Sequence, residues 1–235
     1  MVPSAKALQR IRRDVSQVMG PSKSSLSAQG VYYIPDDSLV YEGTALLVGQ
    51  KDTPYFGGYY FFKLTFPEDY PFSPIKVRTL TQDGRTRFNP NMYIDGKVCL
   101  SILNTWHDGP QWTGVQSLES VLLVIMSDVL NANPLENEPA FRNCGPSEEA
   151  QAYNRLLWYA NLQTSLYNLL TRPPLHAQPF HEILWSEFET NKAEIFRRTA
   201  DASVYDGKTE VCRFFSMKAT YNFTEILQKL KDVKN

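Results

Sequence analysis

Four apolar segments between residues 31 and 80 constrain the fold of this chain most. They are rich in β-branched and aromatic residues, and the second carries Thr44, Leu46 and Val48 in alternation. Their connections are too short for crossover helices, so successive segments must pair as antiparallel strands. We therefore predict a four-stranded antiparallel meander with helices packed on one face. The predicted strands are 31–34, 39–48, 59–66 and 76–80.

Helical patterns lie on both sides of these strands in the sequence. Residues 4–19 place apolar side chains three and four positions apart, with Ser4 as an N-cap and Gly20-Pro21 at the end. The serine-rich segment 21–30 is predicted to be a loop. Residues 116–130 carry a wide apolar stripe typical of a central core helix. Residues 147–171 are predicted to form a third helix capped by Ser147. The fold class is therefore α+β.

The last quarter of the chain is expected to be a folded extension. Pro173-Pro174 breaks the preceding helix, and residues 178–199 and 221–233 carry amphipathic helical patterns. Between them, residues 204–215 contain a turn at Asp206-Gly207 flanked by apolar pieces. We divide the chain into a core domain, 1–171, and a helical C-terminal extension, 172–235, packed on that core.

Composition excludes several classes of function. The formal net charge is −1, so the chain lacks the basic character of a nucleic-acid-binding protein. Three cysteines without framework spacing favour a reducing compartment, and the cysteines and histidines form no zinc pattern. No apolar run is long enough to span a membrane, and no signal peptide is expected. We expect a cytoplasmic or nuclear protein that uses no cofactor and no metal.

The segment from Arg87 to Trp112 carries the chemistry. Cys99 follows two turn signals, Asn89-Pro90-Asn91 and Asp95-Gly96, and Asn91 lies eight residues before it. A cysteine can carry an acyl group as a thioester, and an asparagine amide can stabilise the oxyanion formed when that thioester is attacked. The alternative is a buried structural cysteine beside a turn asparagine.

The sequence FNPNMYIDGKVCLSIL resembles the active-site segment of the ubiquitin-conjugating enzymes. Their pattern is His-Pro-Asn, then a cysteine eight residues after that Asn, then Leu-x-Ile-Leu. Asn91 and Cys99 keep the spacing, whereas Asn89 replaces the largely structural His. The segment TPYFGGYYFFKLTFPEDYPFSPIKV is similar to the family's sheet region. The large Z-type members are most similar, and PFHEILWSEFETNKAEIF resembles their C-terminal extension.

The resemblance implies a UBC-like fold and an acyl-transfer activity. Cys99 would accept ubiquitin or a ubiquitin-like modifier from an activating enzyme as a thioester and pass it to a substrate lysine, usually with a ubiquitin ligase. Asn91 would stabilise the oxyanion or hold the loop. Tyr93 would form part of the apolar wall of the groove that the lysine enters, and Glu138 would orient the incoming amine. Ser101 stands where some members carry Asp.

The resemblance also implies surfaces for protein partners. Arg10 and Arg13, on the basic face of the first helix, would contact the activating enzyme, although a basic helix face is often only solvated. Phe72, in a proline-bounded loop, would contact ubiquitin ligases unless it packs onto the sheet. Gly114 and Val115 occupy a turn assigned to the same surface. Neither nucleic acid nor membrane is expected as a partner.

Residues 104–111 enlarge the loop beside the thiol relative to small family members. His107 lies in this insertion, and we interpret it as a surface residue because the sequence supplies no orienting partner for a Cys/His pair. Two alternatives remain open. One is a non-catalytic ubiquitin-binding variant, which Cys99 in its full motif disfavours. The other is a papain-like cysteine hydrolase, whose local signature is missing.

Overall fold

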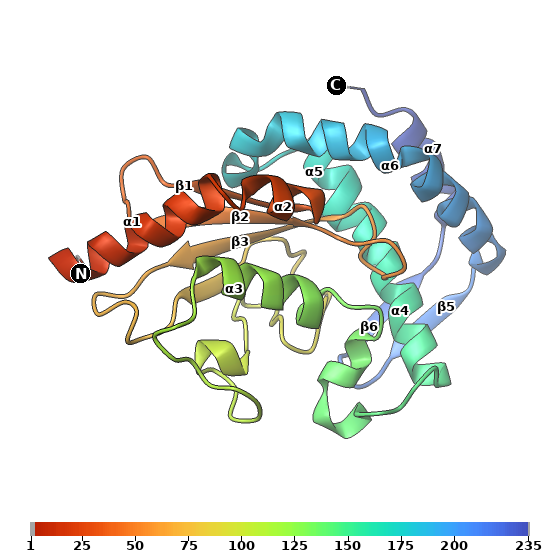
Figure 1. Ribbon diagram of the computed structural model, residues 1–235. Coiled ribbons are helices and arrows are strands. Elements are labelled where there is room, and N and C mark those ends of the chain that lie inside the picture. Colours follow the sequence, from red (N-terminus) through yellow and green to blue (C-terminus); the bar gives the residue numbers. More distant parts are fainter. Residues whose placement is uncertain (1–2, 235) are drawn as a thin grey trace.

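The computed structural model describes residues 3–234, and a four-stranded sheet lies at its centre (Figure 1). The strands follow one another in the order β1-β2-β3-β4, and each pairs with the next in the antiparallel direction. The predicted meander is confirmed. The bounds are β1 Val31–Pro35, β2 Glu42–Val48, β3 Tyr59–Thr65 and β4 Lys76–Thr79.

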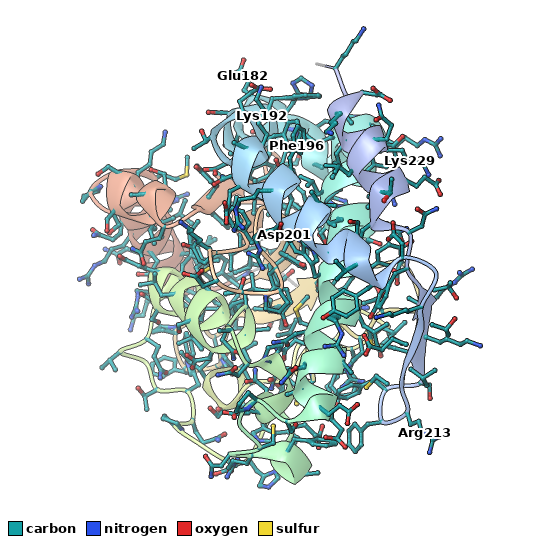
Figure 2. All side chains as sticks on the ribbon, turned by 90° about the vertical axis from the view of Figure 1, so that its right-hand side faces the viewer. Glu182, Lys192, Phe196, Asp201, Arg213 and Lys229 are labelled. Atoms are coloured by element: carbon teal, nitrogen blue, oxygen red, sulfur yellow. The ribbon has the colours of Figure 1, made fainter. Side chains whose placement is uncertain are left out.

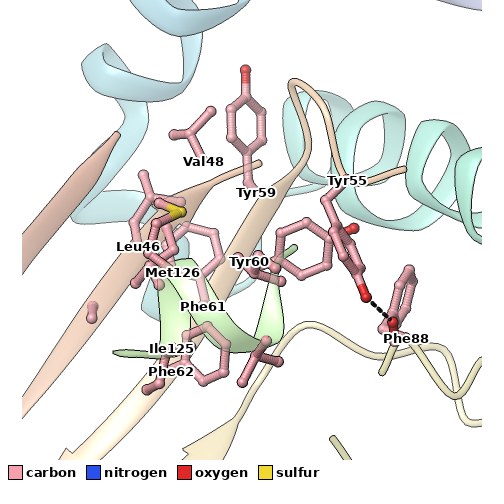
Figure 3. Close-up of a cluster of buried hydrophobic side chains, with 14 of the residues drawn as sticks. Leu46, Val48, Tyr55, Tyr59, Tyr60, Phe61, Phe62, Phe88, Ile125 and Met126 are labelled. Carbon is pink, nitrogen blue, oxygen red and sulfur yellow. Dashed lines mark hydrogen bonds between the residues drawn. The ribbon is translucent and has the colours of Figure 1, made fainter. Parts of the chain in front are cut away.

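Both faces of this sheet are covered, so the prediction of helices on one face is wrong. On one face the Tyr60 hydroxyl donates to Asn161 at 2.7 Å, and Phe62 lies with Ile125 in the buried cluster of Figure 3. On the other face Tyr59 donates to the Leu184 carbonyl at 2.6 Å. The C-terminal extension covers this second face. The alternation of residues within single strands could not reveal that packing.

Helix α1, Ala5–Met19, begins where the sequence predicts. The Ser4 hydroxyl accepts the Ala7 N–H at 3.2 Å. The segment 21–30 is not a simple loop, because residues Lys23–Ala28 form the short helix α2. Leu26 is buried in the core, and Ser22 donates to Glu119 at 2.9 Å. Burial of Leu26 and this side-chain contact outweigh the poor helix propensity of the serines.

The two central helices each change from α to π geometry. Helix α3, Leu118–Val124, starts at a capping box on Ser117 and continues as a π segment, Ile125–Val129. Helix α4, Glu148–Ala160, starts at the predicted cap Ser147 and runs through a π segment, Asn161–Tyr167, into α5, Asn168–Thr171. The π segment contains the buried Asn161, which binds Tyr60 and the Phe56 carbonyl.

The extension packs on the rest of the chain but is not purely helical. A 3₁₀ helix, Leu175–Phe180, leads into α6, His181–Ala202, and α7, Phe223–Lys231, ends the fold beside it (Figures 1 and 2). Between them, β5 Thr209–Cys212 and β6 Met217–Thr220 form a hairpin against α4. The apolar residues that give these two helices their amphipathic pattern are buried, namely Phe180, Leu184, Phe188, Ile195, Phe223, Ile226 and Leu230, except Leu227, which is half-buried.

The hairpin corrects the prediction of a purely helical extension. Its Arg155–Glu210 ion pair joins α4 to β5, with Nε 2.9 Å from the carboxylate. Among residues 3–234, no helix has the length and apolar character needed to cross a bilayer.

Candidate active site

Cys99 lies in an extended segment that ends at a 3₁₀ helix, Ser101–Leu103. The side chain is only 4% exposed, and its thiol donates to the Thr105 carbonyl at 2.7 Å. Its backbone N–H donates to the Asn91 carbonyl at 2.9 Å. The predicted Cys–Asn pair is therefore in contact, and the thiol is held under the segment that follows it.

The asparagines of the turn hold its shape. Asn89 is fully buried, and its amide donates to the carbonyl of Val129 at 2.8 Å while its side-chain oxygen accepts the N–H of Asn91, also at 2.8 Å. The Asn91 amide donates to the Cys99 carbonyl at 2.6 Å. Asn91 therefore braces the backbone that carries the thiol, which agrees with the loop-holding alternative of the sequence analysis.

A third asparagine, which sequence reasoning missed, orients the Asn91 amide. Asn137 donates to the side-chain oxygen of Asn91 at 2.9 Å and to the Asp128 carbonyl at 2.6 Å. Because this contact occupies the oxygen, the Asn91 NH₂ group faces the thiol segment. Asn137 is adjacent to the predicted Glu138, but no motif distinguishes it in the sequence.

The insertion 104–111 folds over the thiol segment. Asn104 closes it by accepting the Trp112 N–H at 2.9 Å. Gly109 has φ +110°, and a Cβ there would lie 2.9 Å from the Ser101 hydroxyl, so this close approach requires glycine. His107 is exposed, packs beside Trp106 and makes no hydrogen bond to Cys99, as expected of a surface residue.

The segment after α3 contacts both the Asn91 turn and the insertion. Glu138 is half-buried between two 3₁₀ turns, Pro134–Asn137 and Pro139–Phe141. Arg142 binds Asp108 of the insertion at 2.7 Å, and this hydrogen bond lowers the pKa of the Asp108 carboxyl. The ion pair joins this segment to the insertion, although exposed pairs of this kind contribute little stability.

The Tyr93 ring lies against the guanidinium of Arg87, a residue that was not among the site residues predicted from the sequence. The Arg87 guanidinium lies 3.6 Å from the centroid of the Tyr93 ring. The same group donates to the Asn89 carbonyl at 3.2 Å and the Pro90 carbonyl at 2.6 Å. Arg87 therefore supports the turn that presents Asn91.

The three residues of the predicted ligase surface, Phe72, Gly114 and Val115, lie in two loops. Phe72 is 83% exposed and Val115 is 88% exposed. The Trp112 indole donates to the Pro71 carbonyl at 2.8 Å, and a Cβ on Gly114 would lie 3.6 Å from that same carbonyl. The two loops therefore adjoin, and the alternative in which Phe72 packs onto the sheet is excluded.

The two predicted docking arginines differ in their surroundings. Arg13 is exposed on α1. The Arg10 guanidinium instead binds Asp14 at 2.9 Å and donates to the carbonyls of Gly114 at 2.9 Å and Gln116 at 2.6 Å. Arg10 thus anchors the Gly114–Val115 turn to α1.

No group of three or more His, Cys, Asp or Glu side chains within residues 3–234 is arranged to hold a metal ion. The chemistry available here is that of a thiol and amide donors.

Known protein sequences match most of this chain. Residues 10–155 match the family model described as "Ubiquitin-conjugating enzyme". The chain is 38% identical over 168 residues to "Ubiquitin-conjugating enzyme E2 Z" of Xenopus tropicalis, covering 71% of this chain and 51% of that protein. The human protein of the same name is 34% identical over 184 residues, covering 78% of this chain and 50% of the relative.

A much larger human relative also matches. "Dual E2 ubiquitin-conjugating enzyme/E3 ubiquitin-protein ligase BIRC6" is 35% identical over 205 residues, covering 82% of this chain and 4% of that protein. The chain spans about half the length of the E2 Z relatives it matches.

Proposed function

The chain belongs to the ubiquitin-conjugating enzyme family, and we propose that Cys99 accepts ubiquitin or a ubiquitin-like modifier as a thioester and passes it to a substrate lysine. The observation that carries this proposal is the placement of Cys99. Its thiol ends an extended segment whose backbone is hydrogen-bonded to both the backbone and the side chain of Asn91. Similarity to E2 Z proteins supports the same activity.

Two acyl transfers make up the reaction. In the first, the Cys99 sulfur attacks the thioester that links the modifier to an activating enzyme. A new C–S bond forms, the old C–S bond breaks, and the departing enzyme thiolate takes up the Cys99 proton. In the second, a lysine amine attacks the new thioester, the C–N bond forms and the C–S bond to Cys99 breaks. The amine loses a proton, and Cys99 leaves as a thiol or thiolate.

The attacking lysine must be neutral, although a free lysine has a pKa near 10.4. A poorly solvated approach lowers that pKa, and so does a nearby positive charge. We propose that the Tyr93 ring, with the Arg87 guanidinium stacked on it, supplies both effects. Glu138, which makes no side-chain hydrogen bond within residues 3–234, would orient the amine and accept its proton.

Two surfaces are proposed for the protein partners. The exposed side chains of Phe72 and Val115, beside Gly114, would bind a ubiquitin ligase, because adjoining exposed apolar residues favour a protein interface. Arg13 would contact the activating enzyme, and Arg10 would contribute by holding the Gly114 turn. Loss of ligase-stimulated discharge in Phe72→Ala, with thioester loading unchanged, would support the first assignment.

We propose that the protein acts in the cytoplasm or nucleus. The three cysteines are free thiols, which fits a reducing compartment. Fractionation of cells expressing the tagged chain tests this assignment.

The function itself is tested by loading. The protein is incubated with ATP, a modifier and each activating enzyme in turn, and the thioester is detected as a gel shift that a thiol reductant reverses. Cys99→Ala should abolish the shift, whereas Cys144→Ala and Cys212→Ala should retain it. Cys99→Ser should form an ester that resists reductant.

Three results would contradict the proposal. Absence of any adduct with the wild-type chain would favour a non-catalytic modifier-binding protein. A reducible adduct on Cys99→Ala would place the thioester elsewhere. Release of ubiquitin from a fluorogenic ester would indicate a cysteine hydrolase.

A further inference from the structure

One contact joins the C-terminal extension to the catalytic segment. It centres on Arg87, which is half-buried two residues before the turn asparagine Asn89. Its guanidinium binds the carbonyls of Asn89 and Pro90 and stacks on Tyr93. Within residues 3–234, no carboxylate lies at ion-pair distance from this cation, and its protein contacts are to carbonyl oxygens and aromatic rings.

Phe215 brings the extension to the same cation. It lies in the turn between β5 and β6, and its ring centroid is 5.7 Å from the Arg87 guanidinium carbon. Figure 2 shows the hairpin turn near the neighbouring Arg213, at the opposite end of the molecule from Glu182 of α6. A guanidinium within about 6 Å of an aromatic ring is attracted by the ring's quadrupole.

Tyr153 of α4 fixes the relation between Arg87 and Phe215. Its ring lies 5.1 Å from the Phe215 ring, and its hydroxyl donates to the Arg87 carbonyl at 2.6 Å. Tyr153 is fully buried, so it forms a rigid base for both residues. The cluster Arg87, Tyr153 and Phe215 therefore connects the hairpin, α4 and the catalytic turn.

Movement of this turn would move Asn91 directly. The Asn91 N–H binds the Asn89 side chain at 2.8 Å, and the Asn91 amide binds the Cys99 carbonyl at 2.6 Å. Arg87 binds the carbonyls of the two residues immediately before Asn91. Displacement of a catalytic group by about 1 Å can cost roughly 100-fold in rate.

We propose that Arg87 and Phe215 are positioning residues, through which the C-terminal hairpin completes the support of the turn that presents Asn91 to the Cys99 segment. The proposal rests on the proposed function for its kinetic consequence. The extension then supports the active site as well as covering the second face of the sheet.

The test uses the full chain and two readouts. Phe215→Ala should speed hydrogen exchange of the Asn91 and Cys99 backbone amides about tenfold, because the turn opens locally more often. It should also slow discharge of the preformed thioester to free lysine. We expect the maximal discharge rate to fall about tenfold, while the lysine concentration that gives the half-maximal rate stays unchanged. Loading should change less than about twofold.

Companion variants separate positioning from general destabilisation. Arg87→Lys keeps the charge but loses the fork that reaches two carbonyls, so it should reproduce the discharge defect. Phe215→Tyr keeps the ring and should restore both readouts. Leu230→Ala removes a buried side chain of α7 far along the extension, and should lower stability without changing discharge. The variant with both Arg87→Lys and Phe215→Ala should be no slower than the slower single variant.

The proposal is overturned if Phe215→Ala leaves exchange at Asn91 and Cys99 unchanged. It is also overturned if Leu230→Ala produces the same exchange and discharge changes at equal stability. Failure of the wild-type chain to form any thioester would refute the proposed function separately, and the exchange measurement would still decide whether the hairpin holds the turn.

Discussion

At the scale of single residues, Asn91 joins two roles that are usually considered separately. Its amide braces the Cys99 carbonyl at 2.6 Å, and Asn137 fixes which side of the amide faces the thiol segment. The same NH₂ group carries a second hydrogen that makes no hydrogen bond within residues 3–234, and we propose that it serves an oxyanion at the Cys99 thioester. Bracing and oxyanion stabilisation are therefore compatible in one side chain.

We expect Asn91→Ala to slow transfer to lysine about 100- to 1,000-fold, the usual cost of losing one oxyanion donor. Loading should remain nearly intact, because exchange of one thioester for another places less demand on the donor. Single-turnover gels of loading and of discharge measure the two rates. Equal losses in both steps would instead assign Asn91 to folding of the segment alone.

At the scale of secondary-structure elements, the 3₁₀ helix Leu175–Phe180 is the piece of the extension that seals the second face of the sheet. Phe61 of β3 lies 5.3 Å from the Phe180 ring and 5.2 Å from the His176 ring, both edge-on. The His176 Nε2 atom is buried and has no hydrogen-bond partner. Burial lowers the pKa of His176 below its ordinary value of 6.5.

This environment predicts that the folded state loses stability in acid. A base whose pKa is lowered in the folded state contributes stability that is complete above the unfolded-state pKa of about 6.5 and is lost as pH falls through the folded pKa. The melting temperature should therefore fall between pH 7.5 and mildly acidic pH. His176→Gln should flatten part of that dependence, whereas His181→Gln, at an exposed position, should not. Equal slopes for all three proteins would rule out His176 as the titrating group.

At the scale of the whole molecule, the extension is continuous with the core. The side chains of Phe180, Leu184, Phe223, Ile226 and Leu230 are each at most 3% exposed. Fully burying a large apolar side chain contributes about 1.5–3 kcal/mol. Short helices are marginal when detached, so these elements depend on the surface beneath them.

Truncation after Thr171 should therefore lower the melting temperature, and the intact chain should resist limited proteolysis across 172–234 nearly as well as across the sheet. Differential scanning calorimetry and timed protease digestion measure these two properties. Rapid cleavage of the extension in the full chain, together with unchanged stability of the truncated chain, would refute the docked arrangement. Unchanged stability with an altered choice of activating enzyme would leave the extension a role in partner recognition only.

Features that depend on residues close together in the sequence could be predicted from the sequence. The strand meander follows from short connections, the helix starts at Ser4 and Ser147 follow from capping, and the Asn91–Cys99 pair follows from a spacing of eight residues within one segment. Each depends on backbone geometry and hydrogen bonds within a short stretch of chain, or on pairing between strands adjacent in sequence.

The remaining features are decided by contacts between distant segments. Asn137 reaches Asn91 across 46 residues, and the Leu184 carbonyl accepts from Tyr59 across 125. Phe215 meets Arg87 only because α4 places the hairpin there. No local period or spacing encodes such contacts, since each depends on how whole elements pack to exclude water from the core. Tertiary packing alone therefore decided that the second sheet face is covered, that the thiol is buried, and that the extension reaches the catalytic turn.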